Sequence, residues 1–173
     1  VGQCELMYLY DNLFSEYSIT VAQLLLTKYI LLEDRRKNVE NALERLISQG
    51  VIPVVNENDT VAIDELELEM GENDSLAAVV ATIANADLLI IMSDIDGLYD
   101  SDPRQNPDAK MIPVVREISE DIHAVAGGAG TKFGTGGMAT KIHAVEIAYE
   151  SDIDDVFDVC HISKLFGYFD YFH

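Results

Sequence analysis

Short apolar runs alternate with amphipathic segments along most of this chain, and this alternation restricts the fold more than any other feature. Three short runs are typical of strands: Val21–Thr27, Val51–Val55 and Asp87–Met92. Longer segments with apolar residues at helical spacing surround them, at residues 6–13, 34–49, 74–85, 119–126 and 138–149. Strands that alternate with helices favour β-α-β units. We therefore expect an α/β fold with a mostly parallel sheet.

Some local signals refine this expectation. Gly50 follows the apolar face of the 34–49 segment and marks a helix end. Pro53 argues against a fully central position for its strand. Asp87–Met92 is almost continuously apolar, as strands covered on both faces are. A last strand is expected at Ile153–Val159, and no repeat or linker divides the chain.

Composition narrows the possible partners. The 173 residues suit about one domain, and 49% apolar with 24% charged residues is ordinary globular usage. A net charge of −20 repels phosphate backbones and anionic lipid, so we expect neither nucleic acid nor membrane as a partner. Cys4 and Cys160 form no disulfide framework, and no signal peptide is evident. A reducing, cytoplasmic location follows as an expectation.

Two polar loops should open at the same edge of the sheet. The second strand ends in Asn56–Asp59 and the third in Ser93–Gly97. Ligands of parallel sheets bind outside the carboxyl ends of the strands, so these loops are candidate ligand contacts. The alternative is that they only form turns and caps, which Asn, Asp and Gly commonly do. The histidines and cysteines show no metal-ligand spacing, so no protein-bound metal is expected.

A glycine-rich segment, Gly134–Lys141, precedes the last predicted helix. Backbone N–H groups at a helix N-terminus bind anions, and Lys141 lies about one turn into the helix. The segment does not fit the GxxxxGK[ST] pattern of nucleotide-binding loops. It matches GxGxxA, but no apolar strand precedes it, which weakens a dinucleotide-binding interpretation. A plain flexible loop before a helix is the other alternative.

Four segments together resemble the glutamate-kinase branch of the amino acid kinase family: Val55–Val61, Gly71–Ala78, Ser93–Tyr99 and Gly134–Lys141. The resemblance extends from Val1 to about Ile153. It implies a three-layer α/β/α sandwich. It also implies ATP-dependent phosphorylation of the γ-carboxylate of L-glutamate, the first step toward proline. ATP and Mg²⁺ would be required, and the chain would self-associate.

The same resemblance implies roles for individual residues. Asp59 and Asn73 would bind glutamate, and Ser93 and Asp94 would lie against the nucleotide. Asp74 would orient the lysines. The phosphates would lie in a cradle formed by Thr135, Gly136, Gly137, Met138, Ala139, Thr140 and Lys141, with Lys141 on the transferring group.

The chain also departs from the family pattern. Glu72 stands where the family usually has Asp. We expect a kinase domain over residues 1–155 that lacks the family's N-terminal strand and its phosphate-binding lysine, followed by an aromatic-rich tail, 156–173. Such a domain would have little activity alone. A non-catalytic nucleotide-binding or interaction module and a dinucleotide-binding oxidoreductase domain stay open as alternatives.

Overall fold

The computed structural model describes residues 2–27, 30, 33–58, 73–93, 97–127, 137–151 and 153. The chain divides into two compact units, Val1–Leu76 and Ala77–His173. Within the described part of the chain, no helix has both the length and the apolar character needed to cross a membrane.

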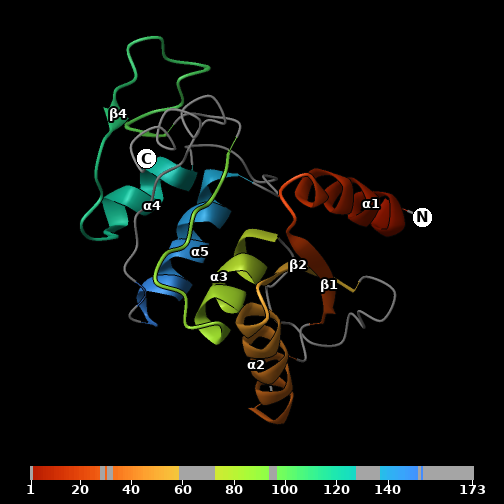
Figure 1. Cartoon of the computed structure of the whole chain (residues 1–173). Helices are drawn as coiled ribbons and strands as arrows, with labels where there is room; N and C mark the ends of the chain where they lie inside the picture. Colours follow the sequence, from red (N-terminus) through yellow and green to blue (C-terminus); the bar gives the residue numbers. More distant parts are fainter. Residues whose placement is uncertain are drawn as a thin grey trace. The chain divides into compact units, whose positions relative to one another are not determined.

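The first unit is built on a parallel pair of strands. β1 (Thr20–Leu26) pairs with β2 (Val51–Glu57), with Thr20 opposite Val51 and Leu26 opposite Glu57. The helix α2 (Glu33–Ser48) connects them and packs against β2. α1 (Gly2–Ser15) packs against β1, and the two are joined by a 2.8 Å hydrogen bond from Gln23 Nε2 to Gln3 Oε1 (Figure 1). The predicted β-α-β unit is therefore confirmed.

Packing and backbone geometry explain the buried face and the C-terminal end of α2. Its buried face is anchored by Leu43, which is 1% exposed. The helix gives way to β2 at Gly50, whose φ of +71° lies in the left-handed region that favours glycine. The Gly50 N–H donates to the carbonyl of Ile47 at 2.9 Å. The predicted helix end is confirmed.

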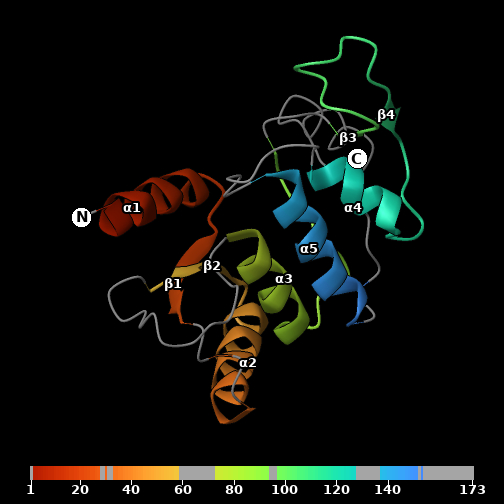
Figure 2. The ribbon, with the colours of Figure 1, turned by 180° about the vertical axis from the view of Figure 1, so that it is seen from behind.

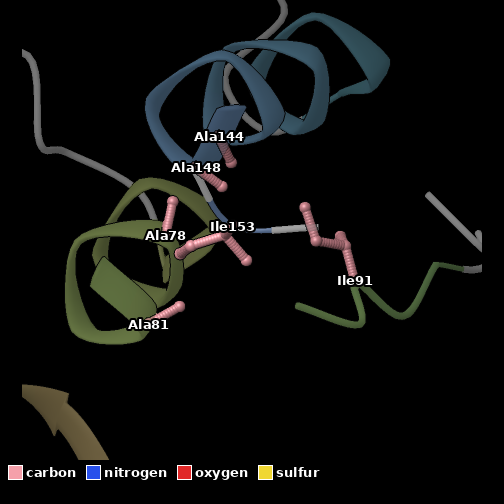
Figure 3. Packing of buried hydrophobic residues seen from close by; sticks show 6 residues of the cluster. All are labelled: Ala78, Ala81, Ile91, Ala144, Ala148 and Ile153. Atoms are coloured by element: carbon pink, nitrogen blue, oxygen red, sulfur yellow. The ribbon is translucent and has the colours of Figure 1, made fainter. Parts of the chain in front are cut away.

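The second unit is centred on a contact between two helices. α3 (Asn73–Ile83) begins in the first unit and continues into the second, where it meets α5 (Met138–Tyr149). Ala78, Ala144 and Ala148 are all 0% exposed at this contact. Figure 3 shows the alanines facing one another, with Ile91 and Ile153 beside them. The alanines of the two helices and the two isoleucines belong to one buried cluster.

The segment Asp87–Met92 differs from its predicted form. It is assigned to neither of the two sheets described, and it is not covered on both faces. Leu89 and Ile91 pack into the cluster of α3 and α5, whereas Leu88, Ile90 and Met92 are 45%, 50% and 48% exposed. The prediction of a strand buried on both faces is wrong for the described residues, because only one face meets the helices.

The remainder of the second unit is a hairpin followed by a helix. β3 (Leu98–Tyr99) pairs antiparallel with β4 (Met111–Ile112), a short pair that the sequence did not predict. Asp102 organises the intervening loop, because its carboxylate accepts hydrogen bonds from the Arg104 N–H at 2.9 Å and from Gln105 Nε2 at 2.8 Å. α4 (Glu120–Gly127) follows and packs against α5, as Figure 2 shows from behind.

The five predicted helices are confirmed to within a few residues, and so is the α/β class with a parallel strand pair. The predicted strand after Ile153 lies outside the described residues. The division into a domain at 1–155 and a tail at 156–173 stays a prediction.

The alanine contact should tolerate little added volume. Ala144→Leu inserts a larger side chain at a position that is 0% exposed. Overpacking of this kind lowers the free energy of unfolding by about 1–3 kcal/mol. Ala124→Leu, on the exposed side of α4, is the matched control and should change it by less than about 0.5 kcal/mol. Urea unfolding measures both. Equal stability of the two variants would contradict the packing described.

Candidate active site

In the first unit, the carboxyl end of β2 leads directly into a polar segment. The Asn58 N–H donates to the Leu26 carbonyl at 2.7 Å, which extends the parallel pairing one residue beyond β2. Asn56 Oδ1 accepts a hydrogen bond from the Glu57 N–H at 2.9 Å. The chain is therefore held in register up to Asn58. Asp59, the predicted glutamate contact, lies outside the described residues.

Asn73 and Asp74 are the first two residues of α3, which begins one residue before the predicted start at residue 74. Asn73 is exposed and Asp74 is half-buried. A carboxylate in the first turn is stabilised by the helix dipole, so Asp74 fits a structural role as well as the predicted orienting role. Both residues belong to the same unit as β2.

In the second unit, Ser93 ends the segment that packs along α5. The segment runs in the opposite direction to α5, so its C-terminal end lies toward the N-terminal end of that helix (Figures 1 and 2). Ser93 is half-buried. Asp94, predicted to accompany it against the nucleotide, lies outside the described residues.

The N-terminus of α5 has the geometry of an anion-binding turn. Gly137 is the N-cap, with φ −139° and ψ −166°, and makes no side-chain capping hydrogen bond. Backbone N–H groups at a helix N-terminus point outward along the helix axis, which is the arrangement that binds anions. Thr140 Oγ1 donates to the Gly137 carbonyl at 2.7 Å and ties the turn together.

Within this turn, Met138, Thr140 and Lys141 are half-buried and Ala139 is exposed. The structure therefore places five of the seven predicted cradle residues on one helical turn, in the same unit as Ser93. Thr135 and Gly136 lie outside the described residues. Among the residues that the structure describes, no three His, Cys, Asp or Glu side chains form a group that could hold a metal ion.

The sequence did not reveal one polar cluster near this helix. Glu146 of α5 contacts His123 of α4 and His143 of α5. The spacing of His143 and Glu146, three residues apart, is visible in the sequence. The contact with His123 depends on how α4 packs against α5, which no local pattern specifies.

Comparison with known proteins identifies the family. The model of the Amino acid kinase family matches residues 1–156. The chain belongs to the amino acid kinase family. This membership agrees with the predicted α/β fold and gives no support to a dinucleotide-binding oxidoreductase.

Curated relatives within this family are similar over most of the chain. Glutamate 5-kinase of Clostridium perfringens is 54% identical over 157 residues, which cover 89% of this chain and 58% of the relative. Glutamate 5-kinase of Listeria monocytogenes serotype 4a is 51% identical over 155 residues, covering 88% and 56%. The enzyme of the same name from Caldanaerobacter subterraneus is 53% identical over 154 residues, covering 88% and 41%. The chain thus spans about half the length of the curated relatives it matches.

Proposed function

We propose that this family member takes part in the ATP-dependent phosphorylation of the γ-carboxylate of L-glutamate, the first step toward proline. The observation that carries this proposal is the identity of 51–54% to relatives named Glutamate 5-kinase. The N-terminus of α5, with Gly137 as the N-cap residue and Lys141 in the first turn, supports it, because helix N-termini suit phosphate groups.

The chemistry needs positioning and charge neutralisation rather than a protein nucleophile. A γ-carboxylate oxygen of glutamate attacks the γ-phosphorus of ATP, the bond from that phosphorus to the bridging oxygen breaks, and ADP leaves. Lys141 and the first-turn N–H groups of α5 would hold the phosphates while negative charge shifts toward the leaving group. Mg²⁺, bound to the ATP phosphates, would supply further positive charge.

The substrate contacts are proposed from the resemblance. Asp59 would hold the amino group of glutamate and Asn73 its carboxylate, while Ser93 and Asp94 would lie against the nucleotide. Asp74, half-buried in the first turn of α3, would orient the lysines. The alternative is a module of the same fold that binds nucleotide without catalysis. Such a module would bind Mg-ATP but release no ADP in response to glutamate.

We also propose a cytoplasmic location and self-association. Cys4 is an exposed free thiol, which suits a reducing compartment. Large apolar or aromatic side chains are exposed along and just after α1: Tyr8 65%, Leu9 55%, Leu13 61% and Tyr17 75%. A second copy of the chain could cover them through a two-fold interface.

Self-association should depend on the α1 residues. Leu13→Glu places a charge in the apolar surface, and two like charges would face each other across a two-fold axis. Sedimentation velocity should show the wild-type chain as an oligomer and Leu13→Glu as a monomer. Glu16→Gln, exposed on the turn that follows α1, is the control and should leave the oligomer intact. A wild-type monomer would contradict the proposal.

Lys141 should matter for turnover rather than for glutamate binding. Lys141→Ala removes the cation proposed to contact the transferring phosphoryl group, so kcat should fall by orders of magnitude with little change in the KM for glutamate. Glutamate-dependent ADP release measures both. Lys110→Ala removes the same charge from the exposed hairpin loop and should have no effect. Equal turnover in the Lys141 variant would exclude the role.

Asp59, unlike Lys141, should matter for glutamate binding rather than for turnover. Asp59→Ala removes the proposed partner of the substrate ammonium group and should raise the KM for glutamate strongly while leaving the KM for ATP unchanged. Asp108→Ala is a matched loss of one carboxylate at an exposed position of the hairpin loop. An unchanged KM for glutamate in the Asp59 variant would remove this residue from the substrate site.

A further inference from the structure

The carboxylate of Glu146 lies between two imidazoles. Glu146 Oε1 is 2.8 Å from Nε2 of His123, and Oε2 is 3.4 Å from Nδ1 of His143. The two contacts differ in what they join. His143 lies three residues before Glu146 on α5, so that contact stays within one helix. His123 belongs to α4, so the shorter contact connects two helices.

Glu146 lies in the C-terminal half of α5, so its contact with His123 can reach the first turn of α5 only through α4. α4 packs against α5, and its C-terminal end lies toward the N-terminal end of α5 in both views (Figures 1 and 2). The first turn of α5 carries Gly137 and Lys141. A contact that restrains α4 on α5 therefore also restrains the end of α4 that lies toward that turn.

Because both side chains are partly exposed, we expect their contact to restrict the orientation of α4 on α5 more than it raises the free energy of unfolding. The His123 side chain is 50% exposed and the Glu146 side chain 32% exposed, and ion pairs this accessible to water stabilise folded proteins little. A hydrogen bond to a carboxylate nevertheless holds its partners within a narrow range of distance and angle. Two helices joined by such a bond have fewer relative orientations open to them.

We propose that Glu146 is a positioning residue, which through His123 holds α4 in one orientation on α5 and so orders the turn Gly137–Lys141. The consequence for nucleotide binding rests on the proposed function, in which this turn contacts the phosphates of ATP. The effect on the order of the turn does not depend on any ligand.

The variants separate the interhelical contact from local charge. His123→Ala and Glu146→Ala both break the contact between the helices. His143→Ala removes the other imidazole but leaves that contact in place. Glu150→Ala removes an exposed carboxylate from the end of the same helix and controls for the change in net charge. His123→Gln keeps a side-chain N–H that can donate to Glu146 and serves as the conservative replacement.

Two measurements on the full chain test the proposal. Hydrogen–deuterium exchange of the peptide that covers Gly137–Lys141, without nucleotide, should be faster in His123→Ala and Glu146→Ala than in the wild type. Exchange in His143→Ala, Glu150→Ala and His123→Gln should stay close to the wild type. Isothermal titration with Mg-ATP should show binding weakened by roughly two- to fivefold in the first two variants only, because an ion pair this exposed cannot transmit more free energy than it supplies.

The possible failures are distinguishable. Unchanged exchange at Gly137–Lys141 in His123→Ala would overturn the positioning role, whatever the nucleotide affinity. The same effect in His143→Ala as in His123→Ala would also overturn it, because local charge would then explain the result. If the wild-type chain binds no Mg-ATP, the proposed function fails, while the exchange data still decide whether Glu146 orders the turn.

Discussion

The buried cluster that α3 and α5 share is the constraint on which the second unit depends. Ala78, Ala144 and Ala148 have no exposed surface, so the cluster that they form leaves little room for larger side chains. Ile91 and Ile153 complete the cluster from segments outside the two helices. A helix N-terminus can bind an anion only if its axis is held in one direction. The proposed binding of phosphate at Gly137–Lys141 therefore depends on the buried alanines, which hold α5 in place.

In the first unit, the parallel pair of β1 and β2 fixes the position of the chain that follows β2. Parallel strands need a crossover, and α2 supplies it while packing on β2. Both strands then end at the same edge, and the hydrogen bond from Asn58 to Leu26 keeps the chain in register past the last strand residue. Backbone pairing thus holds Asn58, the first residue after β2, in a defined place.

Sequence patterns predicted the elements well where the signal is periodic or depends on backbone conformation. Apolar spacing located α2, and Gly50 located its end. The pattern failed for Asp87–Met92, since an apolar run does not specify whether neighbouring strands cover both of its faces. The β3–β4 pair has two residues per strand, too few for any periodicity. Gly137 and Asn73 were correctly placed at helix starts, but their proposed roles came from the family resemblance. The contact of His123 with Glu146 required tertiary structure.

The acidity of the chain makes local order at α5 more important. A net charge of −20 opposes the approach of anionic ligands. That opposition is spread over the surface and screened beyond about 8 Å at physiological ionic strength, whereas aligned N–H donors and a lysine act at hydrogen-bond distance. Local donors therefore outweigh the average field only if they converge. In an acidic protein, the donors can converge on an anion only if α5 and its first turn are held in place. The buried alanines and the proposed role of Glu146 with α4 meet this requirement.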